Sequence, residues 1–159
     1  MQVLNTAQLH HTAFVVHDIE KSAKNLAESM GLQWNVWTIE PASSTVHGQD
    51  MNFTFRVALA AIGDSNFEII MPLTGHNIYV EHLNAHGEGF HHACVTYGTL
   101  KELHQARDSM LKQGRTMLQS ASLGDAGEFY YFEIAETGSI LELLYLDAHG
   151  LPAPEQTIG

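Results

Sequence analysis

The sequence is poor in cations and in cysteine. Seven lysine and arginine residues stand against eighteen aspartate and glutamate residues, which gives a formal net charge of −11. A surface of that sign repels a polyanion, so we expect no nucleic-acid partner. The single cysteine, Cys94, excludes an intrachain disulfide and a zinc site built from several cysteines.

Long apolar runs are also missing. No stretch approaches the ~20 apolar residues of a membrane helix, and no basic segment precedes an apolar one as in a secretory signal. We therefore expect a cytoplasmic protein with no membrane partner. A chain of 159 residues can form one domain with a substantial core, or two half-size modules that share one core.

Histidine is abundant, with eleven residues, and two adjacent pairs occur in matching contexts. His10-His11 and His91-His92 each open a run of β-branched and aromatic residues, which predicts a strand. Each run is followed by a helical pattern and later by a glutamate within an aliphatic strand, Glu68 after the first pair and Glu142 after the second. This repeated order indicates a duplicated module.

Periodicity predicts the same elements in both halves of the chain. Strands are expected at 9–16, 33–40, 52–61, 67–71, 90–97, 115–120, 128–134 and 139–146. One helix should run from Asp18 to Gly31 and another from Thr99 to Gly114, because each range begins with a capping side chain and ends at glycine. A short helix is expected before Gly87.

The expected organisation is one domain spanning 1–159. Module 1 covers about 8–72, a linker 73–88, module 2 about 89–147, and a C-terminal surface tail 148–159. Residues 41–50 have the composition of a loop, and Pro72 should end the last strand of module 1.

Four side chains on predicted strands are candidate metal ligands: His11, Glu68, His92 and Glu142. Imidazole and carboxylate suit a divalent transition metal, and strands hold such ligands rigidly. Taken singly, each could be an ordinary residue on the solvent face of a half-exposed strand. Matched pairs are not expected from independent surface placement, and a glutamate among aliphatic neighbours is costly unless it is paired or binds a metal.

The histidines that precede the candidate ligands are expected to have another orientation. Side chains alternate along a strand, so His10 and His91 should face away from the metal, toward the helix side of the sheet or solvent. The whole ligand assignment depends on this register, and a structure in which His10 or His91 points into the concave face of the sheet would overturn it.

These residues resemble the vicinal oxygen chelate superfamily, which comprises glyoxalase, bleomycin-resistance and dioxygenase proteins, and most closely its methylmalonyl-CoA epimerase-like members. The resemblance covers nearly the whole chain, and its most specific segments are Phe67-Glu68-Ile69-Ile70-Met71-Pro72-Leu73 and His86-Gly87-Glu88-Gly89-Phe90-His91-His92. It implies an α+β fold in which two βαβββ modules form a U-shaped mixed sheet around one divalent metal ion. The ligands that it implies are the four side chains above.

The chain departs from the family patterns at three places. Epimerases often have glutamine at the Glu68 position, whereas a His/Glu/His/Glu set resembles bacterial glyoxalase I, a lactoylglutathione lyase that uses nickel, cobalt or zinc. Glyoxalase I usually has arginine on its first strand, where Val15 lies here. The epimerase motif Pro-Glu-x-Gly-Val is replaced by Asp50-Met51-Asn52-Phe53-Thr54.

The resemblance implies a metal-dependent epimerase, isomerase or lyase that forms an enolate of a small carbonyl or acyl-thioester substrate. The ion would be nickel, cobalt, zinc or manganese, with iron less favoured. Glu142 is the candidate base if it detaches from the metal. Arg56, His47 and Asp50 are candidates for substrate contact, Arg56 because it is the only cation on a predicted inner strand. A small molecule and a second copy of the chain are the expected partners.

Two other functions stay open at this stage. A non-haem iron dioxygenase of the superfamily uses two histidines and one carboxylate, although a fourth protein ligand would fill a position that oxygen needs. A metal-free protein of the same fold could instead bind a small hydrophobic or drug-like molecule, with aromatic residues such as Trp34 and Trp37 lining its pocket.

Overall fold

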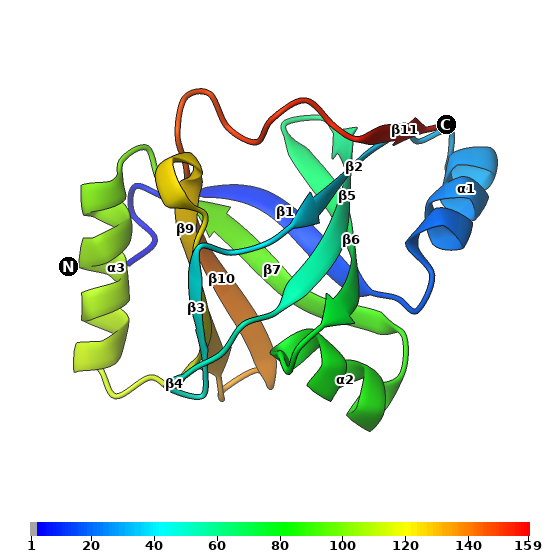
Figure 1. Cartoon of the computed structure of the whole chain (residues 1–159). Helices are drawn as coiled ribbons and strands as arrows, with labels where there is room; N and C mark the ends of the chain where they lie inside the picture. Colours follow the sequence, from blue (N-terminus) through cyan, green and yellow to red (C-terminus); the bar gives the residue numbers. More distant parts are fainter. Residues whose placement is uncertain (1–2) are drawn as a thin grey trace.

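The strands of residues 3–159, the part of the chain that the computed structural model describes, form one mixed sheet in the order β11-β2-β5-β6-β1-β7-β10-β9-β8-β3-β4 (Figure 1). At its centre, β1 (Gln8–Val15) pairs antiparallel with β7 (Gly89–Thr96). A parallel pair flanks this centre on each side, β1 with β6 (Ser65–Thr74) and β7 with β10 (Ser139–Leu146). The arrangement is nearly symmetric about β1 and β7, as a duplicated module predicts.

The remaining principal elements complete two units of the same order. The first unit continues from β1 through α1 (Ile19–Met30), β2 (Trp34–Ile39) and β5 (Thr54–Ile62) to β6. The second continues from β7 through α3 (Leu100–Lys112), β8 (Met117–Ser122), η1 (Gly124–Ala126) and β9 (Gly127–Ile134) to β10. The mixed α+β fold with a U-shaped sheet is therefore confirmed. No helix of the described residues is long and apolar enough to cross a membrane.

Both long helices begin after their predicted capping residues, and α1 ends at Gly31 as predicted, whereas α3 ends at Lys112 with Gln113 rather than Gly114 at its C-cap. The Asp18 side chain accepts a hydrogen bond from the Lys21 backbone N–H, and Gly31 adopts a left-handed conformation with φ of 69°. Thr99 caps α3 in the same way and also contacts Glu102. The helix α1 packs on β5 and β6, and α3 packs on β9 and β10, so both cover the outer face of the sheet.

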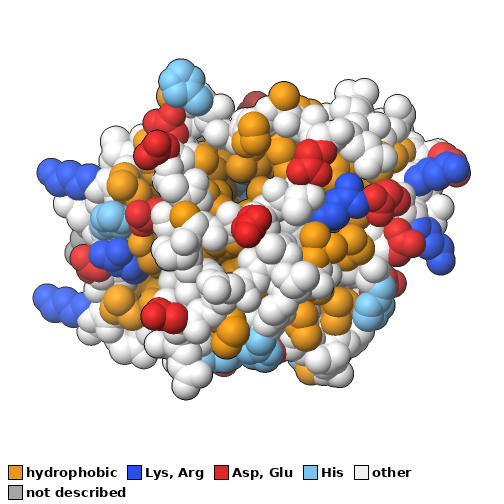
Figure 2. Space-filling model, viewed as in Figure 1, with side chains coloured by type: hydrophobic (Ala, Val, Ile, Leu, Met, Phe, Trp, Pro, Cys, Tyr) orange, Lys and Arg blue, Asp and Glu red, His pale blue; other side chains and the backbone are white. Residues whose placement is uncertain are grey.

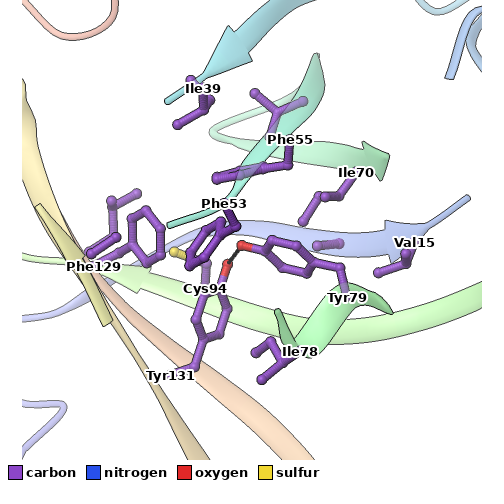
Figure 3. Packing of buried hydrophobic residues seen from close by; sticks show 14 of the residues in the cluster. Val15, Ile39, Phe53, Phe55, Ile70, Ile78, Tyr79, Cys94, Phe129 and Tyr131 are labelled. Atoms are coloured by element: carbon purple, nitrogen blue, oxygen red, sulfur yellow. Dashed lines mark hydrogen bonds between the residues drawn. The ribbon is translucent and has the colours of Figure 1, made fainter. Parts of the chain in front are cut away.

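The inner face of the sheet has its own hydrophobic core. It includes Val15, Ile70, Phe55, Phe129 and Tyr131, which come from both units. The helix α2 (Ile78–His86) adds Ile78 and Tyr79 to this cluster, as Figure 3 shows. The inner face is thus packed at the α2 side and leaves room for a site elsewhere.

Residues 41–50 are not the loop that their composition predicts. They form a hairpin of β3 (Ser43–Val46) and β4 (Gln49–Asp50), and β3 pairs with β8 at the far edge of the second unit. The pairing satisfies an edge of β8 that would otherwise be open, and the Thr45 and Ser120 hydroxyls lie 2.7 Å apart across it. The chain therefore crosses from one end of the sheet to the other before it returns to β5.

The C-terminal tail crosses in the opposite direction. From β10 it reaches β2, where β11 (Gln156–Ile158) adds an edge strand. The Trp37 indole N–H donates to the Pro152 carbonyl at 2.7 Å, and the Glu155 carboxylate accepts from Thr38 at 3.0 Å. The tail is thus held to the first unit rather than being a free extension.

The end of β6 also differs from its prediction. Pro72 does not end β6, which continues to Thr74. A register shift between Thr54 and Phe55 on the facing strand β5 accommodates the proline, which cannot donate a ladder hydrogen bond.

Candidate metal centre

Four buried side chains meet on the inner face of the sheet: His11 from β1, Glu68 from β6, His92 from β7 and Glu142 from β10. Each offers one nitrogen or oxygen atom, and these atoms all lie within 4.8 Å of one another. The predicted convergence of the two modules at these four residues therefore agrees with the structure.

The two imidazoles are central to this cluster. The His11 Nε2 atom lies 3.0 Å from a Glu142 carboxylate oxygen and 3.2 Å from a Glu68 oxygen. The His92 Nε2 atom lies 3.1 Å from the His11 Nε2 atom and 3.0 Å from the same Glu142 oxygen. The Nε2 atoms, and not the Nδ1 atoms, therefore face the centre.

The same strand register places both His–Glu pairs. Ala13, two residues after His11, lies opposite Glu68 in the parallel β1/β6 pair. Cys94, two residues after His92, lies opposite Glu142 in the parallel β7/β10 pair. Because residues two apart share a face, each histidine projects on the same side of the sheet as its glutamate. The repeat in the sequence is thus a repeat in geometry.

The prediction for the preceding histidines is wrong. Each lies at a register shift of the β1/β7 pair: His10 is the extra residue between Leu9 and His11, and His91 is the extra residue opposite the step from Ala13 to Phe14. Such a bulge breaks the alternation of side chains on which the prediction depended. His10 lines the same cavity as His11, and His91 packs beside His92 against Tyr131.

The bulges bring the members of each pair into contact through their Nδ1 atoms. These atoms lie 2.7 Å apart in His10 and His11, and 2.8 Å apart in His91 and His92. A histidine that binds metal through Nε2 carries its proton on Nδ1, so each candidate ligand would donate to its neighbour. The preceding histidine thereby fixes the ring orientation and tautomer of the ligand.

Burial and charge shift the ionisation of these groups. Burial lowers the pKa of His11, but the Glu68 carboxylate, with Cys94 and Glu142, raises this pKa well above its ordinary value. Burial alone would raise the pKa of Glu142, yet hydrogen bonds from His11 and His92 hold it well below its usual range. Burial, reinforced by the neighbouring His92 and His82, keeps the pKa of His91 well below its ordinary value.

The donor set fits a divalent metal ion. Two imidazole nitrogens and two carboxylate oxygens are the ligands that zinc, nickel, cobalt or manganese accept. Ligand atoms about 2 Å from one ion lie roughly 3 Å from each other, which is the spacing between His11 Nε2 and its three neighbours. Two buried carboxylates would also balance the charge of such an ion.

A tyrosine pair that the sequence did not single out supports the second half of the site. The Tyr131 ring lies 4.8 Å from the His92 ring, and its hydroxyl lies 2.9 Å from that of Tyr79 in α2 (Figure 3). The buried Gln119 side chain accepts a hydrogen bond from the Ile78 N–H at 3.0 Å. The sequence signal that could have identified these residues is a polar side chain at an inward position of a predicted strand, Gln119 in 115–120 and Tyr131 in 128–134.

A small cavity opens beside the candidate ligands. Its volume is about 50 Å³, and Glu68, Glu142, His10 and His11 lie in its wall. The rest of the wall is almost entirely apolar, with contributions from β2, β5, β9, β10, the turn before η1 and the C-terminal tail. A substrate that reaches the metal centre would occupy this space.

The residues predicted to contact a substrate lie elsewhere. Arg56 alternates with the inward-facing Phe55 and Val57, so it points to the outer face and forms an ion pair with Glu20 of α1. His47 lies at the turn between β3 and β4, with its Nε2 atom 2.9 Å from a Glu81 oxygen.

Asp50 is exposed at the end of β4. The cavity wall includes none of these three residues, so their placement gives no support to a role in substrate binding.

Several known structures share this fold. A hypothetical protein from Bacillus halodurans is 16% identical, with a TM-score of 0.64 over 93% of this chain and 100% of its own. Methylmalonyl-CoA epimerase from Mycobacterium tuberculosis is 16% identical, with a TM-score of 0.58 over 91% of this chain and 88% of its own. A Streptomyces coelicolor epimerase variant in complex with 2-nitronate-propionyl-CoA is 18% identical, with a TM-score of 0.62 over 91% and 98%.

No curated protein matches the sequence. Residues 10–132, which include three of the four candidate ligands, match a family described as the Glyoxalase/Bleomycin resistance protein/Dioxygenase superfamily. The chain therefore belongs to the glyoxalase/bleomycin resistance/dioxygenase superfamily.

Proposed function

We propose that this protein is a metal-dependent epimerase, isomerase or lyase that acts on a small carbonyl compound through an enolate. The proposal depends on one observation, the convergence of two histidines and two glutamates, all buried, at the same register in both halves of the sheet. These four side chains would hold one ion of nickel, cobalt, zinc or manganese. Such an ion supplies Lewis-acid stabilisation of the negative charge that an enolate carries.

Proton transfer requires an ionised carboxylate at the cavity. Glu142 lines the cavity, and its lowered pKa keeps it ionised at neutral pH. To act as the base, it would have to leave the metal and approach the α-carbon of the substrate. Glu68 lines the same cavity and is the other carboxylate within reach.

The neighbouring side chains exclude water and orient the ligands. Phe55, Val57 and Phe129 give the cavity a dry wall, which strengthens electrostatic interactions at the reacting carbon. His10 and His91 hold the Nε2 atoms of His11 and His92 toward the centre.

Two activities of the superfamily are the finer candidates. One is epimerisation at the α-carbon of an acyl thioester, as in the methylmalonyl-CoA epimerases that share this fold. The other is isomerisation of an α-keto hemithioacetal, as the glyoxalase I-like ligand set suggests. Both begin with removal of an α-proton, so one experiment tests them together.

The test is solvent-deuterium exchange followed by NMR. Metal-loaded protein is incubated in D₂O with 2-substituted malonyl thioesters, α-keto hemithioacetals and uncharged α-hydroxyketones. We expect exchange at the α-carbon of at least one class and its loss in Glu142→Gln. Glu81→Gln is the matched control, because that carboxylate pairs with His47 and His76 outside the cavity.

Two outcomes of this experiment would change the proposal. Absence of exchange in every class, with the metal shown to be bound, would favour a dioxygenase or a binding protein of the same superfamily. If exchange persists in Glu142→Gln but is lost in Glu68→Gln, the proposed reaction is supported and Glu68, rather than Glu142, is the base.

A further inference from the structure

The cations of this protein all lie away from the candidate metal centre. Its seven lysine and arginine residues fall within residues 3–159, and the cavity wall includes none of them. Five belong to α1 or α3, and the remaining two, Arg56 and Arg115, pair with Glu20 and Glu136. In Figure 2 the Lys and Arg side chains lie mainly toward the two sides of the molecule, with hydrophobic side chains around the middle.

The cavity also lacks neutral groups that would hold an anion. Apart from the two glutamates and two histidines beside the metal centre, its wall has one polar side chain, Tyr131. The Tyr131 hydroxyl already contacts the Tyr79 hydroxyl at 2.9 Å. A carboxylate or phosphate buried here out of reach of the metal ion would have no partner, and an unpaired buried charge is strongly unfavourable.

The size of the cavity limits the substrate further. A cavity needs about 10–15 Å³ to hold one water molecule, so a cavity of about 50 Å³ accommodates the equivalent of a few waters, or a group of a few heavy atoms. Leu123, before η1, and Leu151, in the C-terminal tail, are part of its wall. Both segments are fixed by hydrogen bonds, Leu123 to Gly127 and the tail to Trp37.

We infer that this site selects a short carbonyl compound with an apolar substituent, and discriminates against substrates whose substituent carries a carboxylate or phosphate. The inference rests on the proposed metal-dependent function and narrows its substrate class. It favours α-hydroxyketones and similar compounds with an apolar substituent over analogues in which that substituent carries a charge. The two vicinal oxygens of the substrate would face the metal centre, and its apolar substituent would lie against Leu59 and Leu151.

The test uses hydroxamates, which present two vicinal oxygens to a metal and need no turnover. The pair is 4-methylpentanohydroxamate and succinic monohydroxamate, in which a carboxylate replaces an isopropyl group of similar shape. Cobalt-loaded protein is titrated with each, and binding is read from the visible spectrum and by calorimetry. We expect the carboxylated compound to bind at least about tenfold more weakly.

Two variants separate local charge from overall charge. Leu151→Arg places a cation in the tail segment of the cavity wall and should reverse the preference toward succinic monohydroxamate. Leu111→Arg adds the same charge on the exposed side of α3 and should leave the preference unchanged. Should the tail variant fold poorly, Leu59→Arg offers a second position in the same wall.

The outcomes distinguish this inference from the function on which it rests. If cobalt does not bind, or if neither hydroxamate changes its spectrum, the proposed metal-dependent function fails and the inference fails with it. If cobalt binds and succinic monohydroxamate binds as tightly as its apolar partner or more so, the metal centre stands and the substrate class is wrong.

Discussion

The two halves of the metal centre are alike in backbone register and different in surroundings. In both, the residue two positions after the candidate histidine ligand lies opposite the glutamate, and a bulge brings the preceding histidine into contact with the ligand ring. In the first half, His10 is part of the cavity wall. In the second half, His91 is only 4% exposed and packs against Tyr79 and His82 of α2.

This difference indicates how a duplicated site can specialise. The repeated register fixes where the ligands lie, whereas the linker helix α2 has no counterpart among residues 3–159 and covers the second histidine pair. The second histidine pair is thereby kept out of the cavity wall, whereas the first pair faces the space where a substrate would bind. We therefore expect the two halves to respond equally to loss of a ligand and unequally to loss of the supporting histidine.

Loss of a ligand should have the largest effect. His11→Ala and His92→Ala should each weaken metal binding by more than the roughly 10–100-fold that an outer-shell partner contributes. Competition titration with a chromophoric chelator measures this affinity, and His104→Ala is the control because that residue pairs with Glu128 outside the site. If either variant binds metal as tightly as the unmodified protein, the substituted histidine is not a metal ligand.

Loss of the supporting histidine should have an intermediate effect that differs between the halves. His91→Phe keeps a ring in the buried position but removes the Nδ1 contact with His92, so affinity should fall about 10–100-fold. His10→Phe should cost less, since His10 is only partly buried and water can replace its contact with His11. The cobalt spectrum should change more in His91→Phe, and equal effects in the two variants would contradict the comparison.

The pH dependence of stability should be a further signature of the apoprotein. The raised pKa of His11 means that its contribution is full below the ordinary value of about 6.5 and is lost as pH rises through the folded-state value. The pKa of His91 is lowered by burial, so stability falls as pH drops below about 6.5 and the unfolded chain takes up a proton. The lowered pKa of Glu142 adds a loss at more acidic pH, below about 4.3.

These three groups together place the stability maximum of the apoprotein near pH 6.5. Thermal unfolding from pH 4 to pH 9 measures it. A bound metal should remove the alkaline loss, because ligation requires the deprotonated imidazole of His11. An apoprotein whose Tm rises steadily from pH 7 to pH 9 would contradict the ionisation that the structure indicates.

The sequence was sufficient for the repeated elements and for the convergence of His11, Glu68, His92 and Glu142. Both depend on local periodicity and on matched positions in two halves, which a single sequence displays. The orientation of His10 and His91 could not be predicted from the sequence, because a bulge depends on how one strand pairs with another and is not visible in the local composition. The hairpin at β3 and β4 was missed for a similar reason, since it is stabilised by a distant edge strand, β8.

Removal of an outer-face charge should have the smallest effect. Arg56→Ala breaks the ion pair with Glu20, which is half exposed, so the free energy of unfolding should fall by less than about 1 kcal/mol. Metal affinity and hydroxamate preference should stay unchanged, since Arg56 points away from the cavity. Chemical denaturation measures the change in stability, and the cobalt titration measures metal and hydroxamate binding. A weaker affinity of the variant for succinic monohydroxamate would indicate that Arg56 contacts the substrate after all.

The most direct test of the metal centre is its stoichiometry. Protein purified without chelators, and apoprotein reloaded with nickel, cobalt, zinc or manganese, is dialysed and its metal content measured beside that of the His11→Ala and His92→Ala variants. The convergence of four buried donors predicts one tightly held ion per chain and its loss in both variants. Fewer than about one ion per two chains in the unmodified protein, with no tight rebinding of any of the four metals, would contradict a centre built from these ligands.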